Sequence, residues 1–389
     1  MRTLVAALVA SALLMHGAQS VKKNAAGEYT VYIGTYTEPR TGSKGIYAYR
    51  FHPADSRLTP VGLVAETANP SFLAIHPNGQ YLYAVNELDT YRGKATGAVS
   101  AFRIDLRTAK LTLLNTVSSG GGGPCHLLVD ESGKNLLVAN YGTGSVACLR
   151  LREDGSLGDA SAFIQHQGEV FDKKRQGGPH AHSVNLPRGN RFMLATDLGL
   201  DEVLVYRFDA AAGTLAPNQP PIAKVEPGSG PRHFAFHPSE KYAYVLNEIK
   251  STVTAFRYDA AKGSLESLQT ISTLPKNFSG KDLTTAEIAV DQRGRFLYAS
   301  NRGHDSIAVF AIDQTSGKLT LVEITPTQGK TPRNFAIDPA GAYLFAANED
   351  SGTIVVFRID QATGRLTPAG QKLVVPAPVC ITFIGARTD

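Results

Sequence analysis

The sequence predicts an all-β fold, a seven-bladed β-propeller with four antiparallel strands in each blade and a ring closed by the C-terminal strand. Three observations carry this prediction. A sequence motif recurs in which a Pro, an apolar run and a turn precede a second apolar run that ends in Asn. The equivalent positions from Thr35 to Asn348 lie 47 to 56 residues apart, which is the length of one propeller blade. The two ends of the chain carry complementary parts of the same repeat.

Each repeat predicts four short strands. The clearest copy of the first two runs from Pro70 to Asn86, with apolar residues on both sides of the turn at Gly79. A β-branched and aromatic run such as 354–357 follows, and then a Gly-x-Leu turn such as 364–366. Gly tolerates the positive φ of tight hairpin turns, so the Leu begins a fourth strand. A pair of β-sandwiches would explain the strands but not the split repeat.

The ring is expected to close at the N-terminal repeat. The copy of the motif at Tyr32–Tyr36 has only its second half, and the apolar run 378–383 belongs to no complete repeat. Docking this run beside Tyr32–Tyr36 completes the first blade and removes the open sheet edges that favour aggregation. We therefore expect one propeller domain over residues 29–386.

Residues 1–20 have the features of a secretory signal peptide. Arg2 supplies a positive start, residues 4–15 are apolar, and Ala18-Gln19-Ser20 is a small-x-small cleavage site. The apolar run is shorter than the ~20 residues that span a bilayer, and a membrane anchor is the alternative interpretation. We expect a periplasmic or secreted protein that has no membrane association after cleavage.

The composition excludes several classes of function. The 39 Lys and Arg against 34 Asp and Glu give a net charge of +5, and the scattered basic residues predict no binding of nucleic acid. No phosphate-binding loop, dinucleotide fingerprint or nucleophile elbow occurs in the sequence. A strand predicted between Cys125 and Cys148 would hold them ~9–10 Å apart, beyond disulfide reach. Cys380 is the third cysteine, and we expect all three to be buried free thiols. Independently of the cysteines, we expect the protein to be a monomer.

Two columns of side chains should meet on one face of the channel, because the first strand of a blade begins where the second ends. The first column, two residues after the repeat Pro, holds Cys380, Phe72, His126, His182, His233, Glu287 and Asn334, and Arg232 and Arg333 precede two of these. The second column, after the repeat Asn, holds Tyr36, Glu87, Tyr141, Asp197, Glu248, Arg302 and Glu349. Charged groups at a channel need partners or a ligand.

These residue types suit the hydrolysis of a lactone. That reaction needs a base to activate water and positive charge for the oxyanion. Histidine is the natural base near neutral pH, and Arg232 and Arg302 can hold an oxyanion or clamp a phosphate or carboxylate. Glu248 can orient His182, or act as the base if its pKa is raised. The structural alternative is that these groups pair with one another and with water in the channel.

A metal site is a further alternative. His180 and His182 are two residues apart and would project from one face of a strand, although the sequence does not decide which of them enters the site. His126, His233 and Glu287 could complete a ligand set. A single carboxylate in the first column argues against calcium. We expect no metal and no cofactor.

Several motifs along the chain have a known counterpart. They are Gly230-Pro231-Arg232-His233 with His237-Pro238, Tyr244 to Glu248, Pro275 to Ser279, Ala286-Glu287-Ile288, Asn301-Arg302, Thr331-Pro332-Arg333, and His182-Ser183-x-Asn185. Together they resemble the bacterial 6-phosphogluconolactonase propeller family, which is similar to the fungal carboxymuconate-cyclising propeller. The resemblance implies metal-independent hydrolysis of a sugar lactone by His182, Arg232, Glu248 and Arg302. We expect His126, His180, His233, Glu287 and Arg333 to bind the substrate.

Two other functions stay open from the sequence. One is a lactonising cycloisomerase of the carboxymuconate type, and the other is a binding or scaffold propeller without turnover. The phosphorylated lactone of the namesake reaction is cytoplasmic, whereas this chain is expected to be exported. Gluconolactone or another unphosphorylated aldonolactone therefore suits the expected location better.

Overall fold

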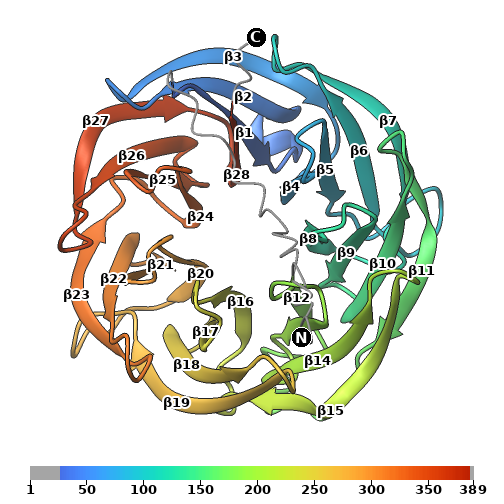
Figure 1. Ribbon diagram of the computed structural model, residues 1–389. Helices are drawn as coiled ribbons and strands as arrows, with labels where there is room; N and C mark the ends of the chain where they lie inside the picture. The colour runs from blue at the N-terminus through green and yellow to red at the C-terminus, as the bar shows by residue number, and fades with distance from the viewer. Residues whose placement is uncertain (1–26, 386–389) are drawn as a thin grey trace, which may run out of the picture.

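The computed structural model describes residues 27–385, which form a ring of seven four-stranded antiparallel sheets around a central channel (Figure 1). The predicted all-β, seven-bladed propeller is confirmed. The expected signal peptide at 1–20 and the last residue of the expected domain, 386, lie outside the described residues. Among the described residues, no helix is long and apolar enough to cross a membrane.

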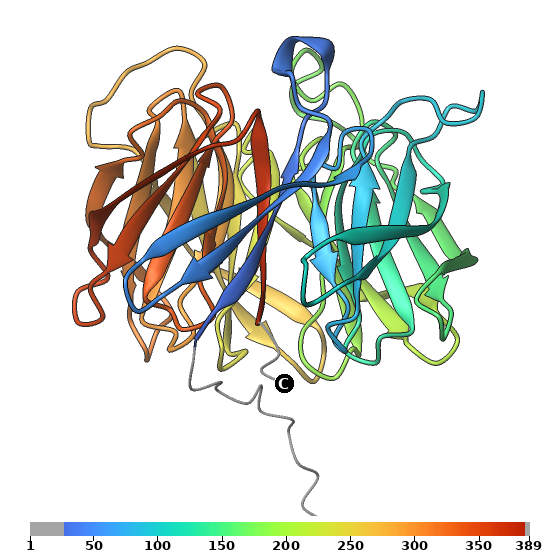
Figure 2. The same cartoon turned by 90° about the horizontal axis from the view of Figure 1, so that it is seen from above.

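The blades are numbered from the N-terminus, and their strands run from the channel outward. Blade one contains β28 (Pro378–Gly385), β1 (Tyr29–Thr35), β2 (Gly45–His52) and β3 (Arg57–Glu66). Blade two contains β4 (Leu73–Ile75), β5 (Tyr81–Asn86), β6 (Ala98–Ile104) and β7 (Leu111–Ser118). Blade three contains β8 (Pro124–Val129), β9 (Asn135–Asn140), β10 (Ser145–Leu151) and β11 (Leu157–Gln165). Blade four contains β12 (Ala181–Asn185), β13 (Phe192–Asp197), β14 (Glu202–Asp209) and β15 (Thr214–Lys224). Blade five contains β16 (Pro231–Phe236), β17 (Tyr242–Asn247), β18 (Thr252–Asp259) and β19 (Ser264–Ser272). Blade six contains β20 (Thr284–Val290), β21 (Phe296–Arg302), β22 (Ser306–Ile312) and β23 (Leu319–Pro326). Blade seven contains β24 (Pro332–Ile337), β25 (Tyr343–Asn348), β26 (Thr353–Ile359) and β27 (Leu366–Val374). A short 3-10 helix, η1 (Pro39–Thr41), stands above one face of the ring (Figure 2).

The C-terminal strand closes the ring as the sequence predicts. β28 pairs with β1 in antiparallel register, with Ile33 opposite Ile381, and it is the innermost strand of blade one (Figure 1). The closure is also packed, because Phe51 in blade one meets the ring of Phe345 in blade seven edge-on at 4.9 Å. Both rings are fully buried, so the first and last blades share one apolar interface.

A repeated tyrosine joins neighbouring blades through the Gly-x-Leu turns. The hydroxyl of Tyr83 donates to the carbonyl of Gly155 at 2.9 Å, and that of Tyr244 donates to Gly317 at 3.0 Å. Gly317 has a φ of +71°, and a Cβ added there would collide with the ring of Tyr242. The turn residue must therefore be Gly for two reasons, its backbone conformation and the aromatic side chain packed on it.

The repeat Asn lies within one residue of the end of the second strand and sets the position of the residue after it. The side-chain amide of Asn140 donates to Ser119 O at 3.2 Å, and that of Asn301 donates to Thr273 O at 3.0 Å. Both asparagines are fully buried, so each amide satisfies a carbonyl at the entry to its blade that would otherwise lack a partner. The next residue, such as Arg302 after Asn301, is thereby fixed at the face of the ring.

The three cysteines are free and buried, as predicted. Cys125 lies on β8 and Cys148 on β10, and β9 lies between these two strands in the sheet. The spacing argument from the sequence therefore holds in the structure.

Candidate active site

A bulge at the start of the inner strands directs two neighbouring residues toward the channel. The register between β16 and β17 shifts between Pro231 and His233, and equivalent shifts occur at the start of β8, β12, β20 and β24. A bulge changes the direction of the side chains around it. It explains why Arg232 and His233, adjacent in sequence, both line the central pocket.

The first column converges inside the channel as expected. The imidazole centroids of His126 and His182 each lie 5.3 Å from that of His233, and Phe72 packs on His126 at 4.2 Å. His233 Nδ1 is 2.8 Å from Glu287 Oε1, and the amide of Asn334 donates to Glu287 Oε2 at 2.5 Å. These histidines, Glu287 and Asn334 therefore form a buried polar layer inside the channel.

Burial sets the ionisation of this layer. It lowers the pKa of His126, His182 and His233 well below the ordinary value, and the guanidinium of Arg232 lowers those of His182 and His233 further. Burial also raises the pKa of Glu287 to about 7. The three imidazoles are accordingly neutral at neutral pH and can accept a proton.

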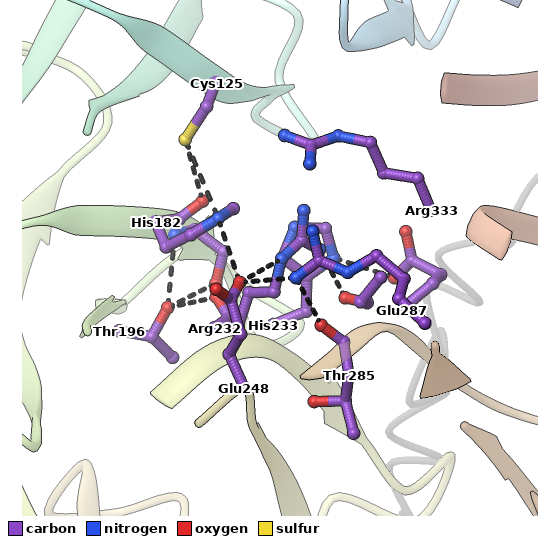
Figure 3. A network of polar contacts seen from close by, with 12 residues as sticks. Cys125, His182, Thr196, Arg232, His233, Glu248, Thr285, Glu287 and Arg333 are labelled. Carbon is purple, nitrogen blue, oxygen red and sulfur yellow. Dashed lines mark hydrogen bonds and ion pairs between the residues drawn. The ribbon is translucent and has the colours of Figure 1, made fainter. Parts of the chain in front are cut away.

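Three guanidinium groups, those of Arg232, Arg302 and Arg175, contact the carboxylate of Glu248. Figure 3 shows Arg232 beside this carboxylate. Glu248 Oε2 lies 3.0 Å from Arg232 Nε and 2.9 Å from Arg302 Nη2, and Glu248 Oε1 accepts from Arg175 Nη2 at 2.7 Å. Arg232 and Arg302 also donate to the backbone carbonyls of Ala286 and Thr285. These two guanidinium groups are therefore held in place from two sides.

The ionisation of Glu248 bears on whether this carboxylate can act as the base. Burial raises the pKa of this carboxyl, but Arg302, Arg232 and Arg175 outweigh burial and hold the pKa below its ordinary value. Glu248 is therefore a fixed carboxylate, and the condition under which it would act as the base is not met. Burial lowers the pKa of Arg302 to about 10, so this guanidinium stays charged at neutral pH.

His182 and His180 occupy different environments. His182 Nε2 lies 4.0 Å from Glu248 Oε2, too far for a hydrogen bond, and His182 Nδ1 lies 3.6 Å from the thiol of Cys125. Glu248 therefore does not hydrogen-bond to His182, although its carboxylate lies close to the imidazole. His180 instead stacks on the ring of Tyr141 at 4.4 Å, and its Nδ1 lies 2.9 Å from Tyr141 O. His182 is therefore the imidazole that reaches Glu248.

Arg333 approaches the same region from the other side of the channel (Figure 3). Its Nη2 donates to the hydroxyl of Tyr36 at 2.7 Å, and that hydroxyl donates to Glu87 at 3.0 Å. Glu349 lies 3.9 Å from Arg333 Nε. A narrow pocket, partly open to solvent, lies between the two sides and is lined by Ser71, Phe72, Glu87, Cys125, Arg232, His233, Arg333, Asn334 and Val379.

The metal site that the histidines suggested can be compared with the positions of their side chains. Within residues 27–385, no three His, Cys, Asp or Glu side chains are grouped so that they could hold an ion. Of the two histidines that suggested a metal, His180 lies against the backbone carbonyl of Tyr141, whereas His182 lies in the buried layer beside His233.

The structure brings together the four residues assigned to catalysis from the resemblance. His182, Arg232 and Arg302 all lie within 4.0 Å of the carboxylate of the fourth, Glu248. Of the residues expected to bind substrate, Arg333 and His233 line the pocket, His126 and Glu287 lie in the buried layer, and His180 lies against Tyr141. Sequence reasoning missed Arg175. It lies in the connection from β11 to β12, outside both columns, and the only available signals were the length of that loop and the basic run 173–175.

Comparison with known proteins gives consistent matches over nearly the whole chain. A family model described as lactonase, seven-bladed β-propeller, matches residues 30–383. A 6-phosphogluconolactonase of Bacillus subtilis is 38% identical over 357 residues, which is 92% of this chain and 99% of that protein. Among solved structures, a putative 6-phosphogluconolactonase from Bacteroides fragilis is 39% identical with a TM-score of 0.85, and the match covers 92% of this chain and 98% of that one. A periplasmic gluconolactonase of Pseudomonas aeruginosa is 34% identical with a TM-score of 0.86, over 93% and 100% of the two chains.

Proposed function

The chain belongs to the lactonase family of seven-bladed β-propellers, and from this premise we propose that it hydrolyses a sugar lactone to the aldonic acid without a metal. The observation that carries the proposal is the group of guanidiniums around Glu248, beside the neutral imidazole of His182. It combines fixed positive charge with a proton acceptor, which are the two requirements of lactone opening.

The guanidiniums of Arg232 and Arg302 stabilise the oxyanion. Attack of water on the lactone carbonyl puts negative charge on the carbonyl oxygen, and preorganised donors lower the energy of that state. Glu248 and the carbonyls of Ala286 and Thr285 hold both side chains in place before the substrate arrives. Little reorganisation is then needed during the reaction.

His182 accepts the proton of the attacking water. Burial and Arg232 lower the pKa of this imidazole, so that it is free to accept a proton at neutral pH but holds it weakly. The carboxylate of Glu248, 4.0 Å from Nε2, offsets this by stabilising the imidazolium as it forms. The proton then passes to the ring oxygen that leaves the carbonyl carbon.

We also propose that the protein is periplasmic or secreted and acts as a monomer. The features of residues 1–20 support export, and the periplasmic gluconolactonase of Pseudomonas aeruginosa is a similar protein with that location. Export favours an unphosphorylated aldonolactone, whereas the Bacillus subtilis relative bears the name of the phosphorylated substrate. No nucleic acid or membrane partner is part of the proposal.

Acid release from glucono-δ-lactone and 6-phosphogluconolactone by the mature protein tests the function. The reaction is followed with excess chelator, spontaneous opening is subtracted, and Arg232→Ala serves as the site variant. We expect acid release above background that survives the chelator and is lost in the variant. Loss of activity on adding chelator would contradict metal independence, and no release from either lactone would contradict lactone hydrolysis.

A further inference from the structure

The loop between β11 and β12, residues 166–180, reaches the candidate site through Arg175, whose guanidinium contacts Glu248. It rises on the same face as η1 (Figure 2). Its first residue is tied to blade four, because His166 Nδ1 lies 2.7 Å from Asp197 Oδ2 and both side chains are fully buried. Its last residue is tied to the same carboxylate, since His180 N donates to Asp197 Oδ1 at 2.7 Å. One aspartate thus anchors both ends of the loop.

The middle of the loop is also held in place. Gln176, which is fully buried, donates through its side chain to Leu198 O at 2.9 Å. The backbone amide of Arg175 donates to Asp172 Oδ1 at 3.2 Å. Toward blade five, the ring of Phe171 lies so close to Gly228 that a Cβ added there would come within 3.1 Å of it. The loop therefore presents the Arg175 side chain over blade five from a fixed backbone.

Arg175 differs from the other two arginines of the cluster in its exposure. Its side chain is 41% exposed, whereas those of Arg232 and Arg302 are 3% and 14% exposed. Arg175 Nη2 contacts Glu248, and the guanidinium also interacts with the side chain of Tyr141. Because a guanidinium has five N–H donors in a planar fork, these two partners leave donors on its exposed side. Arg175 can therefore keep its contact with Glu248 and bind a second anion on its solvent side.

The charges around the candidate site favour such an anion. Three guanidiniums contact the single carboxylate of Glu248, which leaves two positive charges in excess. On the other side of the channel, Arg333 is accompanied by two carboxylates, Glu349 and Glu87, and Glu87 accepts only from the neutral hydroxyls of Tyr36 and Ser71. Counted together, the four guanidiniums and three carboxylates leave one positive charge in excess. Arg175 is the most exposed of the three guanidiniums on Glu248, so it is the one that a second anionic group can reach from solvent.

We propose that Arg175 is a specificity-determining residue, which recognises an anionic substituent of the lactone, a phosphate or a carboxylate remote from the reacting carbonyl. This inference rests on the proposed lactone hydrolysis. It adds to that function a residue outside the repeat columns that selects among lactones.

The test compares wild type, Arg175→Ala, Arg175→Lys and the control Lys174→Ala. Lys174 is the exposed neighbour on the same turn. Values of kcat/KM are measured for glucono-δ-lactone, 6-phosphogluconolactone and glucaro-1,4-lactone, which carry a neutral, a phosphate and a carboxylate substituent. We expect Arg175→Ala to lower kcat/KM for an anionic lactone about tenfold or more beyond its effect on the neutral one, mainly through KM. Arg175→Lys should recover part of the loss, and Lys174→Ala should resemble wild type.

The pattern of losses decides the outcome. A loss confined to the phosphorylated lactone supports the proposal and identifies phosphate, and one confined to the glucaro-lactone identifies carboxylate. An equal loss on all three lactones means that Arg175 only positions Glu248, and no loss on either anionic lactone also overturns the proposal.

Equilibrium binding separates this inference from the proposed function. Calorimetry with 6-phosphogluconate, glucarate and gluconate requires no turnover. If wild type hydrolyses no lactone but binds an anionic sugar acid more tightly than gluconate, and Arg175→Ala removes that preference, the function fails and the role of Arg175 stands. If wild type shows no such preference, Arg175 has no role in selectivity, whatever the protein hydrolyses.

Discussion

Arg302 and Glu248, which lie on neighbouring blades, form an ion pair with Nη2 and Oε2 2.9 Å apart and with side chains 14% and 9% exposed. Their position follows from the repeat, since each is the residue after a buried Asn at the end of a second strand. The packing of blades five and six therefore determines the charge distribution at the candidate site.

Replacing Glu248 by Gln should destabilise the protein in a pH-dependent way. The variant leaves Arg232 and Arg302 without their carboxylate, and we expect a loss of about 3–5 kcal/mol in the free energy of unfolding at neutral pH. The pKa of Glu248 is lowered in the folded protein, so its stabilisation is present above the ordinary pKa and is lost as pH falls through the lowered one. Urea unfolding should therefore show a difference from wild type that shrinks as the pH falls below the ordinary pKa of a Glu carboxyl, about 4.3. A difference that stays constant with pH would contradict this account.

Replacing His182 by Gln should reduce turnover much more than replacing His180. His182 lies next to Glu248, and loss of a general base typically costs about 10²- to 10⁴-fold in rate. His180 contacts Tyr141 and a backbone carbonyl, so His180→Gln should leave kcat within about tenfold of wild type. Steady-state kinetics on glucono-δ-lactone, with circular dichroism to confirm folding, makes the comparison. Equal effects of the two substitutions would remove His182 from the role of base.

Glu287→Gln should change how stability responds to pH. Burial raises the pKa of Glu287 to about 7, so its protonated form stabilises the fold at low pH, and this contribution is lost as pH rises from the ordinary value through about 7. The variant cannot ionise at this position. Its stability relative to wild type, measured by urea unfolding, should therefore increase between about pH 5 and pH 8. The histidines facing Glu287 titrate in both proteins, and taking the difference reduces their contribution. A constant difference over this range would show that Glu287 does not titrate there.

Tyr244→Phe should destabilise the fold, and Tyr258→Phe provides a matched control. Tyr244 donates a buried hydrogen bond to Gly317 O in the next blade, and its loss leaves a buried carbonyl unsatisfied at a cost of about 1–3 kcal/mol. The hydroxyl of Tyr258 is buried and has no hydrogen-bond partner among the described residues. Its removal should cost little or increase stability slightly. Thermal unfolding of the two variants ranks them, and a larger loss in Tyr258→Phe would be the opposite of what the structure predicts.

The sequence by itself determined the propeller, its closure and the two columns. A period of about 50 residues, the unfinished repeat at Tyr32–Tyr36 and the unused run at 378–383 leave few other arrangements. Such features are local, because turn chemistry and alternation along a strand repeat in every blade. The position of a residue in its repeat therefore predicted its position in the ring. On this basis Arg232, Glu248 and Arg302 were predicted to lie on the same face of the channel.

Only the tertiary structure decided the chemistry within the columns. Which of His180 and His182 reaches Glu248 depends on the bulge at the start of β12, and the lowered pKa of Glu248 depends on three guanidiniums from different parts of the chain. Arg175 comes from a non-repetitive loop, so no periodic pattern could assign it to the site. The physical reason is that a repeat specifies backbone geometry blade by blade. Electrostatic interactions depend instead on distances of a few ångströms between side chains that meet only after the ring has closed.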